Sequence, residues 1–235
     1  MTKLRNMLIA SIAIVALSTS AFAGNFGVGF TGSVANIEAS GSSTDGVADT
    51  STQKASVSNS AILGALFAEY TFSGDHGLTL GASMIPGSAQ VSGSATTTSK
   101  IEASKTGTEN ELTSLSDGVS RTADAEVSDV VTYYVELPVH SGVYLKAGYA
   151  ELDVTSKYNS SNGVTYSNAA VDGAMMGIGY KGDFGGSTYF KVEGTHTAYD
   201  DFKVKSQGNS AGGSVNTVTA DLDVTALTVG LGLRF

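Results

Sequence analysis

The chain ends in Ala226-Leu227-Thr228-Val229-Gly230-Leu231-Gly232-Leu233-Arg234-Phe235, a stretch in which every second residue is large and apolar. Successive side chains of an extended strand point to opposite faces, so these apolar residues share one face. The other face carries small residues and Arg234. The pattern predicts a β-strand with one apolar face and one small or polar face.

The same alternation recurs along the rest of the chain. Near its start, Phe26, Val28, Phe30 and Val34 alternate with Gly27, Gly29, Thr31 and Ser33. Six further stretches show it between these two ends: Ala61–Phe72, Leu78–Gln90, Val127–Val139, Val143–Val154, Gly173–Lys181 and Thr188–Tyr199. The sequence therefore predicts eight strands.

The predicted connections alternate strictly between short and long. Three are tight and contain glycine: Ser73–Gly77, His140–Gly142 and Gly182–Ser187. Four are long and rich in Ser, Thr, Asn and Gly: 39–60, 91–126, 155–172 and 203–220. Compact soluble domains rarely contain several structureless connections above about fifteen residues, whereas transmembrane barrels combine short periplasmic turns with long extracellular loops. We therefore predict an all-β fold, an eight-stranded antiparallel transmembrane β-barrel. In 91–126 the sequence favours disorder over the alternatives of a helix or a hairpin extension.

The N-terminus has the pattern of a secretory signal peptide. Lys3 and Arg5 precede an apolar run from Met7 to Leu17, and Ala21 and Ala23 supply the small residues of a cleavage site. The run is too short to cross a bilayer as a helix, which needs roughly twenty residues. We predict a signal peptide over 1–23, cleavage after Ala23, and a barrel domain over 24–235.

Composition excludes several classes of function. The 13 Lys+Arg against 22 Asp+Glu give a net charge of −9, so a broad basic surface for nucleic acid is not available. The chain has no cysteine, which excludes disulfides, thiolate metal sites and a cysteine nucleophile.

Charged residues recur on the small-residue face of the predicted strands. They are Glu69, Glu136, Lys146, Lys181, Lys191, Glu193 and Arg234. A face of small residues suits the interior of an eight-stranded barrel, which has room only for side chains, so we predict that the polar face is the inside. An isolated buried charge costs several kcal/mol. The seven residues are therefore expected to pair and to plug the lumen.

Catalytic and metal-binding patterns are weak. The three histidines, His76, His140 and His196, are scattered over separate connections and strands. The acidic pairs Asp200-Asp201 and Asp221/Asp223 flank the last long connection, but no metal-binding motif accompanies them. We predict no enzymatic activity, no metal and no cofactor.

Three segments, Tyr144–Tyr149, Gly177–Tyr180 and Phe190–Gly194, together with the C-terminal strand that ends on Phe235, resemble the small outer-membrane β-barrel proteins of Gram-negative bacteria, of the OmpA-like, OmpX-like and Opa-like types. The resemblance implies a location in the outer membrane, in contact with lipid and lipopolysaccharide. It also implies that periplasmic chaperones and the barrel-assembly machinery are partners during biogenesis. In that family the machinery recognises the terminal strand, and Leu231, Leu233 and Phe235 would carry that signal here.

The resemblance is compatible with three functions. The first is a porin-like barrel with a structural, envelope-maintaining or narrow-pore role and a plugged lumen. The second is a cell-surface interaction protein, an adhesin or ligand binder, that uses its long loops. The third is a conduit for small hydrophobic solutes, as in OmpW-like barrels. The long loops contain few large apolar residues, which are the usual anchors of a tight interface, so the sequence favours the first function.

Overall fold

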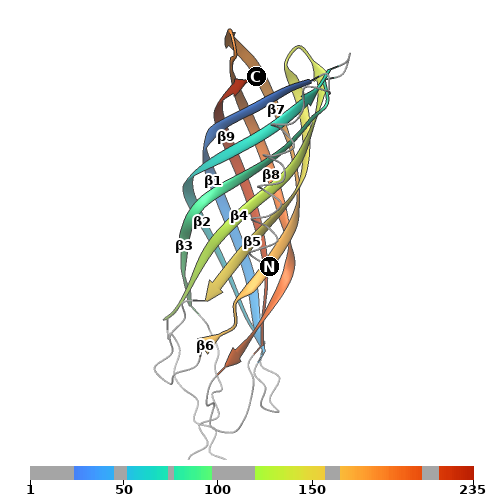
Figure 1. Cartoon of the computed structure of the whole chain (residues 1–235). Helices are drawn as coiled ribbons and strands as arrows, with labels where there is room; N and C mark the ends of the chain where they lie inside the picture. Colours follow the sequence, from blue (N-terminus) through green and yellow to red (C-terminus); the bar gives the residue numbers. More distant parts are fainter. Residues whose placement is uncertain (1–23, 45–51, 74–76, 97–119, 157–164, 208–216) are drawn as a thin grey trace, which may run out of the picture.

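A computed structural model describes residues 24–44, 52–73, 77–96, 120–156, 165–207 and 217–235. The predicted signal peptide lies outside these residues. The described chain forms β-strands joined by turns (Figure 1). The strands are β1 (Gly24–Thr44), β2 (Thr52–Phe72), β3 (Thr79–Thr96), β4 (Ser120–His140), β5 (Val143–Ser156), β6 (Thr165–Tyr166), β7 (Ala169–Gly185), β8 (Thr188–Gln207) and β9 (Thr217–Arg234).

Eight long strands close into an antiparallel barrel. Each pairs with its neighbour along the chain, and β1 pairs with β9 from Gly27↔Arg234 to Thr44↔Thr217, which closes the ring. The two-residue β6 only adds to the end of β8, through Thr165↔Gln207. The predicted eight-stranded barrel is confirmed. Within the described residues no helix is long and apolar enough to cross a membrane.

The tight turns lie at one end of the barrel, which we call the short-turn end; the opposite end is the loop end. The C-terminus lies at the short-turn end, the upper end in Figure 1. Between β4 and β5 the turn consists of Ser141 and Gly142, both with positive φ (46° and 86°). Two successive residues with positive φ match the twist of the flanking strands and so favour a tight hairpin.

The strands run further toward the loop end than the alternation predicted. Of the segments expected to be loops, 39–60 is strand up to Thr44 and again from Thr52, and 91–126 is strand up to Thr96 and again from Ser120. The expectation of disorder is therefore wrong for 91–96 and 120–126, while 97–119 lies outside the described residues. Polar Ser/Thr-rich sequence hid these extensions, because a strand needs cross-strand partners more than it needs apolar residues.

Side chains alternate between the lumen and the outside as the barrel requires. On β7, for example, Val171, Gly173 and Met175 are buried, whereas Ala174 and Met176 are exposed. Large apolar residues cover the outside near the short-turn end. They include Phe30, Val34, Ile62, Leu66, Leu80, Leu145, Ile178, Leu227, Val229 and Leu231.

The register shifts part-way along three strands, in β3 between Ile85 and Ser88 and also in β4 and β8. In β4 the register shifts between Ser128 and Val131, where Asp129 has a φ of 55°, and in β8 it shifts between Tyr199 and Phe202. A bulge adds one residue to one strand, so the face that each later residue occupies changes. As a result Val127 and Phe202 pack inside the barrel.

The lumen near the loop end is apolar, and its central residues lie on stretches of β5, β7 and β9 whose mutual register is not shifted. Leu152, Val154, Val171 and Leu222 form a buried cluster, which we call the apolar core. Partly buried residues pack against it: Ile37, Ala39, Ala125, Val127, Val130, Ala169, Tyr199, Phe202 and Val224. The prediction of a polar interior is thus wrong for the half of the barrel nearer the loop end, where polar residues face outward instead.

Candidate functional site

Six charged side chains from five strands meet in the lumen near the short-turn end. They are Glu69 on β2, Glu136 on β4, Lys146 on β5, Lys181 on β7, and Lys191 and Glu193 on β8. We call this set the ion cluster. Three carboxylates face three ammonium groups, so its formal charge is balanced.

Lys191 lies at the centre of the ion cluster and is only 1% exposed. Its Nζ lies 3.0 Å from Glu69 Oε2, 2.8 Å from Glu136 Oε1 and 3.2 Å from Glu193 Oε1. One ammonium group therefore contacts all three carboxylates. Such multiple contacts offset the large cost of removing a charge from water.

The other two lysines bridge pairs of carboxylates. Lys181 Nζ lies 2.7 Å from both Glu69 Oε1 and Glu136 Oε2. Lys146 Nζ lies 2.8 Å from Glu193 Oε2 and 4.0 Å from Glu136 Oε1. The cluster is thus a connected network across the lumen, in which every member has at least two ionic partners.

Three tyrosines complete the hydrogen bonding of the carboxylates. Tyr134 and Tyr189 donate to Glu69 over 3.2 and 2.8 Å, and Tyr144 donates to Glu193 over 2.6 Å. Lys146 Nζ also lies 3.9 Å from the centre of the Tyr134 ring, within the range of a cation–π interaction. No role was predicted for these tyrosines from the sequence. Their parity relative to Glu136, Lys146 and Lys191 is the signal that could have found them.

Glycines on other strands make room for the tyrosine rings. A Cβ at Gly81 of β3 would overlap the Tyr134 ring, and one at Gly179 of β7 would overlap Tyr144. On β1, a Cβ at Gly27 would lie 2.6 Å from the Tyr189 hydroxyl oxygen. The space that these rings need explains why glycines occur on the lumen face of the strands. An eight-stranded lumen holds large rings only opposite residues without a side chain.

Arg234 lies outside the ion cluster, contrary to the prediction. Its Nη1 lies 3.2 Å from Asp183 Oδ1, and this aspartate is 65% exposed. The guanidinium also lies 5.0 Å from the ring of Tyr189. Arg234 occupies the penultimate position of the chain, so it lies at the mouth of the lumen, where water and Asp183 are accessible.

The remaining predicted residues lie apart from the ion cluster. Leu231, Leu233 and Phe235 are exposed on the outer face of the C-terminal strand. Ala21 and Ala23 lie outside the described residues, as does His76. His196 lies on the outside of β8, with Nδ1 3.1 Å from Thr225 Oγ1 and Nε2 3.7 Å from Asp223 Oδ1.

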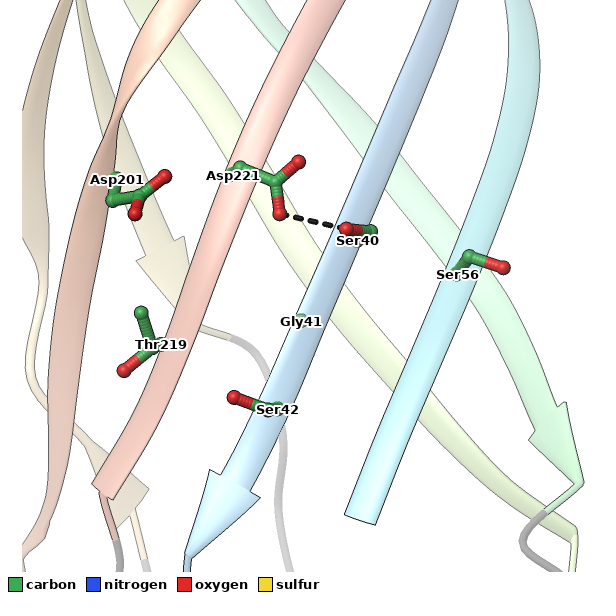
Figure 2. Close-up of a pocket in the computed structure, with 7 residues that line it drawn as sticks. All are labelled: Ser40, Gly41, Ser42, Ser56, Asp201, Thr219 and Asp221. Carbon is green, nitrogen blue, oxygen red and sulfur yellow. Dashed lines mark hydrogen bonds between the residues drawn. The ribbon is translucent and has the colours of Figure 1, made fainter. Parts of the chain in front are cut away.

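A hollow of about 470 Å³ lies near the loop end, across β2, β1, β9 and β8 (Figure 2). It is lined by Ser40, Gly41, Ser42, Ser56, Asp201, Thr219 and Asp221. Ser40 donates a 2.7 Å hydrogen bond to Asp221 Oδ1. One of the two carboxylates that line the hollow therefore already has a hydrogen-bond donor. Among the described residues no group of three or more His, Asp or Glu side chains is placed to hold a metal ion.

Similarity to solved structures concerns the fold. Outer membrane protein OprG from Pseudomonas aeruginosa matches with a TM-score of 0.50 and 16% identity, over 91% of this chain and 97% of OprG. The outer membrane protease OmpT from Escherichia coli matches with a TM-score of 0.49 and 12% identity, over 93% of this chain and 100% of OmpT. AlkL, an outer membrane protein, gives 0.48 and 14%, over 93% of each chain. No family model and no curated protein sequence matches. The chain has the fold of the small outer-membrane β-barrels of Gram-negative bacteria.

Proposed function

We propose that this protein is an integral outer-membrane barrel with a structural role, whose lumen is closed to the passage of ions along its axis. The observation that carries the proposal is the ion cluster, in which Lys191 contacts all three buried glutamates. A pore needs a continuous column of water. Here the lumen holds charges that are paired with one another, and their exposed fractions are between 1% and 15%.

The apolar core supports closure at a second level. Leu152, Val154, Val171 and Leu222 are each at most 8% exposed, so protein atoms surround them. Ions do not cross an apolar constriction readily, because they would lose their hydration there. The axial path therefore meets a paired-charge layer and then an apolar layer. The proposal assigns no catalytic step to the barrel.

Planar-bilayer recording of the refolded protein tests this function. We expect no sustained conductance from the wild-type barrel. A barrel carrying Glu136→Ala and Lys191→Ala loses two connected side chains of the cluster and is expected to conduct more, whereas Asp183→Asn, outside the cluster, should behave as wild type. Steady wild-type channels would contradict the closed lumen.

One observation favours a second candidate, the conduit for small hydrophobic solutes. Within the described residues β2 and β3 pair only from Leu66↔Met84 to Thr71↔Thr79, although both strands continue toward the loop end. Pro86 lies just beyond, where the register of β3 with β4 shifts, and proline cannot donate a ladder hydrogen bond. The apolar core has no member from β2 or β3 among the side chains described.

This second candidate routes an apolar solute sideways, from the apolar core between β2 and β3 toward the membrane. Uptake of a small hydrocarbon by cells that produce the protein tests it. Faster uptake than in cells producing a Leu152→Asp variant, which places a carboxyl group in the core, would support the conduit. The wild-type and variant barrels are compared at equal levels in the outer membrane. Equal uptake by these cells and by cells with an empty vector would contradict the conduit, so that only the structural role would remain.

A further inference from the structure

We infer that the half of the barrel nearer the loop end stands in water outside the lipid acyl chains, as a barrel of the water-soluble kind with its own core. The inference deepens the proposed function, since it assumes that the barrel is inserted in a membrane. It concerns where lipid contact stops on the outer surface. Two independent patterns, one outside and one inside the barrel, change at the same level.

The outside changes from apolar to polar within two residues on four strands and within four residues on two more. Each pair below gives the last apolar and the first polar residue of the outer face, moving from the short-turn end toward the loop end. They are Val34 and Asn36 on β1, Ile62 and Ser60 on β2, Tyr149 and Glu151 on β5, Met176 and Asp172 on β7 (with Ala174 between), Val192 and His196 on β8 (with Gly194 between), and Leu227 and Thr225 on β9. A charged residue on the lipid face costs about 2–4 kcal/mol at the bilayer midplane, so the acyl chains end near this line.

The length of the apolar band agrees with a bilayer. On β1 it runs from Phe26 to Val34, and on β9 from Phe235 to Leu227. A tilted strand needs about 9–11 residues to cross the hydrocarbon layer. Both strands continue well past the line, to Thr44 and back to Thr217, and these extensions are not needed for crossing.

The inside changes in the opposite sense. On the short-turn side of the line the lumen holds the ion cluster, and on the loop side it holds the apolar core. On β9, Leu222 and Val224 pack inward whereas Asp221 and Asp223 face outward. Apolar side chains inside and carboxylates outside are the arrangement of a barrel in water, where burying the apolar face contributes about 25 cal/mol per Å².

Tyr149 marks the line itself. Its ring lies on the outer face of β5 and is 44% exposed, and its hydroxyl donates a 2.6 Å hydrogen bond to Asp172 on β7. Asp172 lies two residues closer to the loop end than Ala174, the residue that Tyr149 faces across the strand pair. The apolar ring thus lies on the lipid side and its polar tip reaches toward water, as expected for a tyrosine at a membrane interface.

Single-cysteine labelling locates the line, because the native chain has no cysteine to interfere. Three matched pairs, each on one strand, suit the test: Val34→Cys and Asn36→Cys, Leu227→Cys and Thr225→Cys, Met176→Cys and Asp172→Cys. Each variant carries an environment-sensitive fluorophore and is refolded into vesicles with lipids brominated along the acyl chain. We expect strong quenching at 34, 227 and 176, and little quenching at 36, 225 and 172.

The outcomes separate the inference from the proposed function. Equal, strong quenching within every pair would mean that lipid covers the polar part as well, and would overturn the inference while leaving membrane insertion intact. Absence of quenching at all six sites in a correctly folded barrel would contradict the membrane location itself. A protein-only readout, far-UV circular dichroism of each labelled variant, establishes that the barrel has folded.

Discussion

Lys191 and Glu69 are 122 positions apart in the chain, yet Lys191 Nζ lies 3.0 Å from Glu69 Oε2 across the lumen. The contact joins β8 to β2, which are not neighbours in the ring. Only closure of the barrel brings them together. The contact therefore exists only when the barrel is closed. Loss of either partner leaves a buried charge with too few counter-charges.

Removing a central charge should destabilise the barrel strongly. We expect Lys191→Met to lower the free energy of unfolding by about 3–5 kcal/mol, the range for breaking a buried ion pair. Glu193→Ala should lower it by the same amount if water does not reach the Lys146 ammonium group. Urea titration of the barrel in vesicles, followed by tyrosine fluorescence, measures this. The exposed pair Arg234–Asp183 supplies the control: Asp183→Asn should cost about 0–1 kcal/mol. Equal effects at both sites would contradict the central role of Lys191.

The glycine opposite Tyr134 should not tolerate a methyl group. Gly81→Ala places a Cβ against the Tyr134 ring, and overpacking of this kind costs about 1–3 kcal/mol. Gly32→Ala is the matched control, because no atom lies within 4 Å of a Cβ there. In the double variant Gly81→Ala, Tyr134→Ala, the penalty of the glycine substitution should disappear. A Gly81 penalty that persists without the ring would assign it to the backbone instead.

The lipid-facing side of the last strand should reject a charge. Leu231 lies on the outer face midway between Phe235 and Leu227, so Leu231→Lys should cost about 2–4 kcal/mol in a bilayer. Thr228→Ser, on the lumen side, keeps the hydroxyl that bonds to Ser33 over 2.7 Å and should be nearly silent. Refolding yield on gels, where a folded barrel migrates faster when it is not boiled, gives a second readout. A silent Leu231→Lys would argue against lipid contact.

Truncation within the apolar core should be costly although the core lies on the loop side of the line where lipid contact stops. Leu152 is 3% exposed, and Leu152→Ala should lower stability by about 2–5 kcal/mol. The loss should be the same in vesicles of short-chain and long-chain lipid, because the residue does not face lipid. Hydrogen exchange of the backbone amides near Leu152 and Leu222 is expected to rise. A loss that depends on chain length would place the core within the bilayer.

The connection between β3 and β4 should be replaceable. Thr96 and Ser120 are directly paired, so a short Gly/Ser turn can join them in place of residues 98–118. We expect barrel assembly to continue, as judged by heat-modifiable gel migration. Adhesion or phage sensitivity conferred by the protein should vanish if the surface-interaction function is correct. Retained adhesion in this variant would remove that function from the segment.

The sequence by itself determined the number of strands and the outer surface near the short-turn end. Leu227, Val229, Leu231 and Leu233 alternate with small residues without a break, and period-two alternation has one structural meaning. The six charged residues of the ion cluster share the opposite parity for the same reason. Their shared face was predictable because each of them lies in a stretch of its strand where the alternation is unbroken.

Tertiary structure decided everything that depends on partners across the barrel. Bulges near Asp129 and before Phe202 turn apolar residues inward, because the one extra residue in each changes the face of every residue beyond it. Arg234 shares the parity of the cluster but lies at the mouth of the lumen, because height along the axis depends on strand tilt and register. Whether a residue has an odd or an even position along its strand specifies its face of the sheet. A contact across the lumen also requires that both residues lie at the same level along the barrel axis, and only the closed ring fixes that level.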